Sequence, residues 1–294
     1  GGEQLLWSLG KGLQKRGHEV TWIAPRNSVL ADRLNKISPA LQNAVSSPAS
    51  FIGVSGKRLR PWQVPGIRRE LHRVGVDILL CNDSHALNWG YALRLGQSNI
   101  RQVGVKHTIF PIRSKLKYQL MADRLICVSR AVYQQAIESG LSPDRLCTIH
   151  GAIETPRPVT MTSRERIRAT LQLQPTTRLL VAVGSLIPCK GFAELIQACV
   201  LLKKKQIDFH LAICGDGSQR LILERQIEQL ELEDHVTLVG FQQEPQEWIA
   251  AADLFVHPSH SEGLSLVTIA AQMLKIPVAA TSVGGLHEVM HSPV

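Results

Sequence analysis

Hydrophobic and polar residues alternate along this chain in two periods that follow one another regularly. Segments with apolar positions three or four residues apart, the period of a surface helix, are separated by short runs rich in Val, Ile and Leu, which suit buried strands. The helical pattern predicts helices near residues 3–16, 62–74, 85–95, 130–139, 191–204, 217–230, 244–251 and 265–274. The strand-like runs are HEVTWIA, DILLC, RQVGVKH, RLICVS, LLVAVGS, FHLAICG, VTLVG, LFVHPS and IPVAAT.

This alternation indicates the fold class. Neither Asn-Gly nor Asp-Gly joins two strand-like runs as a hairpin, and Asp216-Gly217 leads from a strand into a helix instead. Strands that alternate with helices build parallel sheets with helices on both faces. Burial on both faces also explains why the runs are continuously apolar. The sequence therefore predicts an α/β protein with doubly wound parallel sheets.

A polar segment with two prolines divides the pattern into two halves. HGAIETPRPVTMTS, residues 150–163, has little apolar content and no period, as is typical of a linker. We therefore expect two Rossmann-like domains, 1–153 and 164–294, joined by residues 154–163. In such sheets ligands bind beyond the carboxyl ends of the strands. Two domains that face each other across a cleft would thus approach a ligand from both sides.

Charge is distributed unevenly between these halves. Residues 1–155 contain 21 Lys and Arg against 10 Asp and Glu, whereas residues 156–294 contain 12 against 14. The basic half suits an anionic partner, such as a membrane surface or a phosphorylated acceptor, and the alternative is a solvated basic surface without a partner. The chain has no nucleic-acid recognition motif, so nucleic acid is not an expected partner.

The remaining composition narrows the class of protein. Hydrophobic residues make up 44% of the chain and charged residues 19%, as in ordinary globular proteins. No apolar stretch reaches the roughly 18 to 20 residues that a transmembrane helix needs, and we find no signal peptide. The six cysteines form no C-x-x-C pair, so we expect reduced thiols and no cysteine metal site. These features favour a cytoplasmic protein.

Three strand–loop–helix segments in the second half share a layout that suits phosphate. VAVGSLIPCKG carries Lys190, LAICGDGSQR carries Gly215, and FVHPSHSEGLSLV carries Glu262. Helix N-termini attract phosphate through their free N–H groups and partial positive charge, and Lys190 adds a full charge. Because glycine also serves ordinary turns, each loop alone is a weak signal. Together the three loops predict a diphosphate site.

Glu262 indicates what accompanies the diphosphate. A carboxylate repels another anion at contact distance, but it accepts hydrogen bonds from hydroxyl groups. A sugar next to a diphosphate, as in a nucleotide sugar, satisfies both requirements. The alternative is that Glu262 caps a neighbouring helix. Ser265 could likewise cap its own helix or offer its hydroxyl to the ligand.

The segment SEGLSLVTIAAQMLKIPVAATSVGGLHEV resembles the donor-binding segment of glycosyltransferase family 4, retaining enzymes of the GT-B fold. VGSLIPCKGF, CGDGSQR, LEDHVTLVGF and AAADLFVHPS continue the resemblance in the second half, and GGEQLLWSLGKGLQKRGHEVTWIA, DRLICVSRAV and IHGAIE in the first. The resemblance implies transfer of a sugar from a nucleotide-diphosphate-sugar donor to an acceptor hydroxyl, with retention of configuration and no essential metal or other cofactor. It also implies a glycan or lipid-linked acceptor at the inner membrane face, in lipopolysaccharide or other surface-glycan synthesis.

By the same resemblance, individual residues receive roles. Glu262 would face the donor sugar and Lys190 the diphosphate. His107, in GVKHTIF, matches a histidine near the reacting carbon and acceptor, and a structural role at a strand end is the open alternative. Further donor-binding residues implied are Gly2 (with Gly1 in the loop after the family's first strand), Ser185, Gly215, Val239, Gly240, Phe241, Gly263, Leu264, Ser265 and Leu266.

Three departures from the family pattern affect the expected donor site. Ala270 stands where a second acid usually holds the ribose hydroxyls, a loss of about 1–3 kcal/mol in donor affinity. Ser185 stands where many relatives have a basic residue. Both ends look short: the first strand is absent, and the chain stops at GLHEVMHSPV. The alternative function is therefore a catalytically impaired homologue that binds a glycan or a protein.

Overall fold

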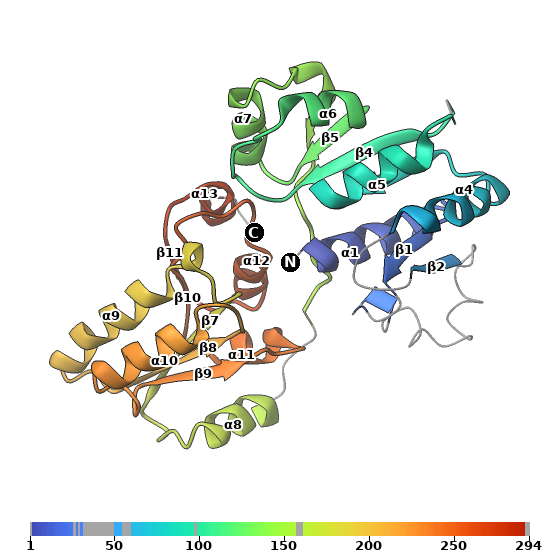
Figure 1. Cartoon of the computed structure of the whole chain (residues 1–294). Helices are drawn as coiled ribbons and strands as arrows, with labels where there is room; N and C mark the ends of the chain where they lie inside the picture. Colours follow the sequence, from blue (N-terminus) through green and yellow to red (C-terminus); the bar gives the residue numbers. More distant parts are fainter. Residues whose placement is uncertain are drawn as a thin grey trace. The chain divides into compact units, whose positions relative to one another are not determined.

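The computed structural model describes residues 2–25, 28, 30–31, 50–54, 60–96, 99–156 and 161–291. The chain divides into two compact units, Gly1–Ala152 and Ile153–Val294. In both units the strands pair in parallel and helices connect them, as Figure 1 shows. The predicted α/β class with parallel sheets is thus confirmed.

The first unit contains two parallel sheets. Strands β1 and β2 form a two-stranded sheet, whereas β3, β4, β5 and β6 form a four-stranded sheet in sequence order. Asp83 and Ser129 begin the helices that follow β3 and β5, since their side chains accept hydrogen bonds from first-turn amides. The elements are α1 (Gly2–Lys15), β1 (Thr21–Pro25), β2 (Ser50–Val54), η1 (Pro61–Gln63), α4 (Val64–Arg73), β3 (Ile78–Cys81), α5 (Ser84–Arg94), β4 (Arg101–Lys106), α6 (Lys115–Met121), β5 (Arg124–Cys127), α7 (Arg130–Glu138), η2 (Pro143–Arg145) and β6 (Leu146–Thr148).

The second unit is built on one five-stranded parallel sheet in the order β11-β10-β7-β8-β9. From β7 the chain winds toward β9 on one side and later toward β11 on the other, so the topological switch point lies between β7 and β10. The elements are α8 (Met161–Thr170), β7 (Arg178–Val183), η3 (Pro188–Lys190), α9 (Phe192–Lys204), β8 (Phe209–Cys214), α10 (Arg220–Gln229), β9 (Val236–Gly240), α11 (Pro245–Ala251), β10 (Leu254–His257), α12 (Leu266–Met273), β11 (Val278–Ala280) and α13 (Gly285–His291).

Both faces of this sheet are buried, which explains the continuous apolar runs of its strands. Along β7, Leu179 and Val181 belong to one apolar cluster, with Phe255 of β10, while Ala182 belongs to another, with Phe192 of α9. Successive residues of a strand point to opposite faces of a sheet. The central strands of the sheet therefore contribute side chains to both apolar clusters, one on each face.

The apolar pattern missed the elements that have no clear period. These are β2, β6, α6, α8 and α13. Residues 161–163, expected in the linker, already belong to α8, and the helix expected from 217 begins at Arg220. All six cysteines are free, and Cys147 and Cys189 are only partly buried. None of the helices within the described ranges is long and apolar enough to cross a membrane.

Ion pairs help to hold α8, in addition to Ile167, which is buried in the apolar cluster that contains Leu179 and Phe255. The Asp253 carboxylate accepts the Leu179 amide at 2.8 Å and contacts Arg164 at 2.6 Å and Arg168 at 3.5 Å. Burial raises the pKa of this carboxyl, but the amide and the two guanidinium groups outweigh burial and hold its pKa below the ordinary value. The charged form of Asp253 therefore stabilises the fold.

We expect Asp253→Asn to lower the free energy of unfolding by about 2 kcal/mol at pH 7, because one amide cannot satisfy two arginines and a backbone N–H. A depressed folded-state pKa contributes stability above the unfolded pKa of about 4, and the contribution is lost as pH falls through the folded value. Urea denaturation of both proteins should show that the difference between their free energies of unfolding narrows below pH 4. The same difference at pH 3 as at pH 7 would contradict the stabilising role of the charged Asp253 carboxylate.

Candidate functional site

Two loops meet at the switch point of the second unit. One follows β7 and carries Lys190 at the end of η3, and the other follows β10 and carries Glu262. The His260 amide donates a hydrogen bond to the Cys189 carbonyl at 2.9 Å, from the second loop to the first. Adjacent parallel strands place their carboxyl ends at the same edge of a sheet, so residues 72 positions apart converge.

Gly191 allows this close approach of the two loops. Its φ of 68° lies in the left-handed region, and a Cβ atom there would lie 2.0 Å from the Pro258 carbonyl oxygen. Only glycine fits without a shift of backbone. The close packing of the two loops thus explains why a glycine stands between Lys190 and α9.

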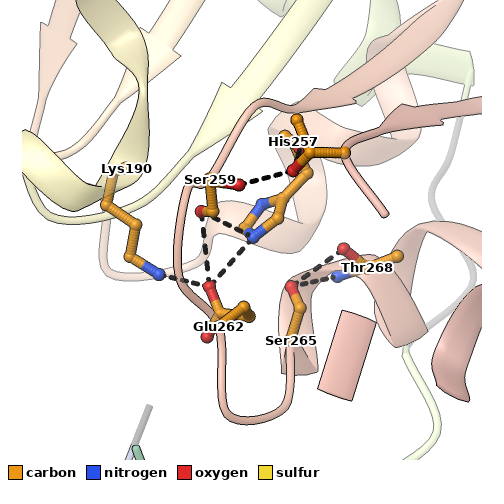
Figure 2. Close-up of polar contacts among 7 residues, drawn as sticks. Lys190, His257, Ser259, Glu262, Ser265 and Thr268 are labelled. Carbon is orange, nitrogen blue, oxygen red and sulfur yellow. Dashed lines mark hydrogen bonds and ion pairs between the residues drawn. The ribbon is translucent and has the colours of Figure 1, made fainter. Parts of the chain in front are cut away.

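Lys190 and Glu262 form the centre of the site (Figure 2). The Lys190 Nζ lies 2.5 Å from Glu262 Oε2, and both side chains are largely buried. His257 Nε2 lies 3.1 Å from the same oxygen and Ser259 Oγ lies 3.4 Å from it. Glu262 is therefore held by three side chains, and within the described part of the chain its carboxylate accepts no hydrogen bond from a helix amide.

The environment of Glu262 favours its charged form. Burial raises the pKa of this carboxyl, but the hydrogen bond with His257 and the charge of Lys190 more than compensate, and its pKa lies below the ordinary value. The site thus presents an ionised carboxylate and an ammonium group side by side. One can accept hydroxyl groups, and the other can attract phosphate.

Ser265 begins α12, the helix that follows Glu262. Its Oγ accepts a hydrogen bond from the Thr268 amide at 3.3 Å and another from the Thr268 hydroxyl at 2.8 Å. Of the two roles that the sequence left open for this hydroxyl, the structure shows the cap. The predicted residues Gly263, Leu264 and Leu266 lie at this N-terminus, whose amides carry the partial positive charge.

The other predicted residues lie at the ends of neighbouring strands. Ser185 is exposed just after β7, and Gly215 follows β8. Val239 and Gly240 end β9, and the next residue, Phe241, is 74% exposed. From β10 to β9 this edge spans three strand spacings, about 14 Å at 4.8 Å each. A ligand with several linked parts can lie along it.

Ala270 lies one turn into α12, and its methyl group belongs to a buried apolar cluster at 2% exposure. The position is part of the core. A carboxylate introduced there would be desolvated, and a hydrogen bond from a ligand hydroxyl would offset part of that cost.

In the first unit the structure brings His107, Asn82 and Gly2 together. His107 Nε2 lies 2.8 Å from Asn82 Oδ1, and burial lowers the pKa of His107 below its ordinary value. A Cβ atom on Gly2 would meet Asn82 at 3.4 Å and His107 at 3.8 Å. The expectation that Gly2 lies in a loop is wrong, because Gly2 is the first residue of α1. Gly1 lies outside the described residues.

An apolar cavity of about 420 Å³ lies in the same unit. One wall is α1, which contributes Leu5, Leu9 and Leu13, and the opposite wall includes Val105 of β4. Asn82, the partner of His107, also lines this cavity. The cavity therefore adjoins the residues predicted to meet an acceptor.

Sequence reasoning missed His257 and Ser259. His257 and Ser259 end the strand-like run LFVHPS, and nothing in their spacing indicates that they contact Glu262. Among the described residues, no group of three or more His, Cys, Asp and Glu side chains is placed to hold a metal ion.

Family models match both units. Residues 1–157 match the model for Glycosyltransferase Family 4, and residues 163–292 match the model for Glycosyl transferases group 1. The chain therefore belongs to glycosyltransferase family 4 and has the GT-B fold.

Two relatives illustrate the similarity. D-inositol 3-phosphate glycosyltransferase of Pseudarthrobacter chlorophenolicus is 35% identical over 129 residues, which are 42% of this chain and 31% of that protein. N-acetyl-alpha-D-glucosaminyl L-malate synthase of Bacillus anthracis is 23% identical over 301 residues, covering 96% of this chain and 76% of the relative. The match thus spans under a third of the first relative.

Solved structures share the fold across nearly the whole chain. HepE from Anabaena, crystallised with UDP and glucose, has a TM-score of 0.80 at 19% identity and covers 98% of this chain and 79% of its own. Sucrose-phosphate synthase from Thermosynechococcus elongatus has a TM-score of 0.76 at 19% identity and covers 96% and 76%. At these identities the likeness concerns the fold.

Proposed function

We propose that this protein transfers a sugar from a nucleotide-diphosphate-sugar donor to an acceptor hydroxyl, with retention of configuration. The observation that carries the proposal is the pairing of Lys190 with the ionised Glu262 at the N-terminus of α12. Lys190 and the helix amides stabilise the diphosphate as it leaves, which is the main catalytic need of this reaction. Glu262 accepts hydrogen bonds from the sugar hydroxyls.

The rest of the donor lies along the same sheet edge. The nucleoside follows the diphosphate toward Gly215 and the β9 end, where Val239, Gly240 and the exposed Phe241 offer an apolar surface to the base. Ala270 gives the ribose no carboxylate acceptor, and Ser185 adds no second positive charge. We propose that both residues weaken donor binding without abolishing it, and that the reaction needs no essential metal.

On the first unit we propose that His107 contacts the acceptor. The Asn82 contact orients its ring, and its lowered pKa favours the neutral imidazole, which can accept a proton from a hydroxyl. The apolar cavity next to Asn82 supports an acceptor with an apolar part, such as a lipid-linked intermediate of lipopolysaccharide or another surface glycan.

Product analysis tests this function. The protein, a panel of UDP-, GDP- and ADP-hexoses and an acceptor bearing a free hydroxyl are incubated in EDTA, and the new anomeric bond is identified by proton NMR. We expect one donor to give a glycoside with the configuration of the donor. An inverted product would contradict retention, and binding without any turnover would favour the catalytically impaired homologue.

A segment of the first unit supports a peripheral position at the inner face of an anionic membrane. Phe110, Leu116 and Leu120 are 52%, 64% and 57% exposed. Arg113 and Lys115 are exposed between them, and residues 108–122 contain no Asp or Glu. Exposed apolar side chains beside basic ones suit the interface of an anionic bilayer.

We expect Arg113→Glu/Lys115→Glu to weaken binding to phosphatidylglycerol-containing vesicles at least tenfold, since each basic residue near such a surface contributes about 1 kcal/mol. Co-sedimentation at fixed ionic strength measures the effect. The matched control is Lys204→Glu/Lys205→Glu, the same charge change on the second unit, which should leave binding within twofold. Equal losses in both variants would contradict the segment's role.

A further inference from the structure

We propose that His257 and Ser259 are positioning residues, which hold the Glu262 carboxylate toward the donor sugar after Lys190 has turned to the diphosphate. The inference rests on the proposed function. It adds two residues to the site and assigns Lys190 to the diphosphate, and His257 and Ser259 to the position of Glu262. It starts from the three side chains that meet one oxygen atom of Glu262 (Figure 2).

The hydrogen positions at this oxygen follow from the groups present. With the Lys190 ammonium at 2.5 Å, Glu262 is an ionised carboxylate, which only accepts hydrogen bonds. His257 Nε2, at 3.1 Å, must therefore carry the hydrogen and donate it. Ser259 Oγ lies 3.1 Å from the same nitrogen and cannot donate to it, so its hydroxyl hydrogen points to Glu262 Oε2 at 3.4 Å.

All three of these contacts converge on Oε2 of Glu262. A carboxylate oxygen with three donors is saturated, and the carboxyl plane is fixed by them. Oε1 is then the oxygen that turns to a ligand hydroxyl. The geometry thus separates one oxygen for the protein from one for the sugar.

The three donors differ in their freedom to move. Lys190 has a long, flexible stem at a loop, and an ammonium group exchanges readily between two anions. His257 and Ser259 are buried at 2% and 0% exposure. Thr281 holds their backbone, because its amide donates to the His257 carbonyl at 3.2 Å and its hydroxyl to the Ser259 carbonyl at 2.5 Å. When a diphosphate takes Lys190, these two donors remain in place.

The consequence concerns the sugar alone. Without the His257 hydrogen bond the Glu262 carboxylate can rotate, and its contact with the sugar is lost, while the diphosphate contacts are unchanged. A variant should therefore lose affinity for the sugar nucleotide but keep its affinity for the nucleoside diphosphate. A purely structural histidine would affect both ligands equally.

Calorimetric titration of His257→Met with a nucleoside diphosphate and with its sugar conjugate tests the inference. We expect roughly a tenfold loss for the conjugate, as for one hydrogen bond to a charged group, and less than twofold for the diphosphate. His257→Gln, whose Nε2 is the same number of bonds from Cα, should recover most of the loss. His210→Met is the matched control for the loss of a buried histidine. His210 lies at the amino end of β8, away from the site, and contacts Asp234 and Thr237.

Two further results decide the remaining cases. Should His257→Met fail to fold by its thermal melt, Ser259→Ala provides the same test with a smaller expected loss for the conjugate only. Equal losses for both ligands, or no loss for either, would overturn the positioning role. If the wild-type protein binds neither ligand, the proposed function itself fails, and that outcome is distinct.

Discussion

Lys190→Ala should weaken binding of the nucleoside diphosphate by about 10- to 100-fold, the effect of losing a charge-assisted hydrogen bond. Two contributions act together. The phosphate loses its ammonium partner, and Glu262 loses the cation that lies 2.5 Å from its Oε2. A carboxylate without that cation repels an incoming phosphate, so we expect the loss to lie toward the upper end of the range.

Isothermal titration at constant ionic strength measures this effect. Lys204→Ala is the matched control: Lys204 ends α9, the helix that begins just after Lys190, and its side chain is exposed. It should bind the nucleotide as the wild type does. Unchanged affinity in Lys190→Ala, or equal losses in both variants, would show that Lys190 does not meet the diphosphate.

Gly215→Ala should have the largest effect on stability, about 3–5 kcal/mol of unfolding free energy. A Cβ atom at this position would lie 1.8 Å from the Gly184 carbonyl oxygen, and the backbone φ is 155°. Because the obstacle is backbone, a side-chain shift cannot relieve it. The loops after β7 and β8 would have to separate, and the Gly215 hydrogen bond to the Gly240 carbonyl would be lost.

Urea denaturation followed by tryptophan fluorescence measures this loss, since Trp248 is buried in the same unit. Gly66→Ala is the control: Gly66 lies in α4, and a Cβ atom there has nothing within 4 Å. Alanine favours helix over glycine, so that variant should be more stable by up to about 1 kcal/mol. A Gly215→Ala protein as stable as the wild type would contradict the close contact of the two loops.

The sequence predicts elements wherever apolar period is strong, and it fails where other forces hold an element. β7, β8 and α9 follow their apolar runs closely. By contrast α8 has the sequence MTSRERIRAT, in which Ile167 enters the apolar core while Arg164 and Arg168 contact Asp253. Pairing with a residue so distant in sequence leaves no periodic signal.

The candidate site shows the same limit. Lys190 and Glu262 can each be recognised from the loop that carries it. Their contact, however, depends on β10 lying next to β7, and the local sequence pattern does not predict the order of the strands in the sheet. His257 and Ser259 are harder still to predict from the sequence, because they act only through their contacts with Glu262. The family resemblance implies a loop at Gly2, yet Gly2 begins α1, where His107 and Asn82 lie nearby.

The central claim is that the second unit binds a nucleotide-diphosphate sugar at the edge that holds Lys190 and Glu262. Calorimetric titration of UDP, GDP and ADP into the wild-type protein in EDTA tests it most directly. We expect one nucleotide to bind at micromolar to millimolar strength and its sugar conjugate to bind more tightly. If a folded protein binds none of the three nucleotides or their conjugates, the donor site as described here is wrong.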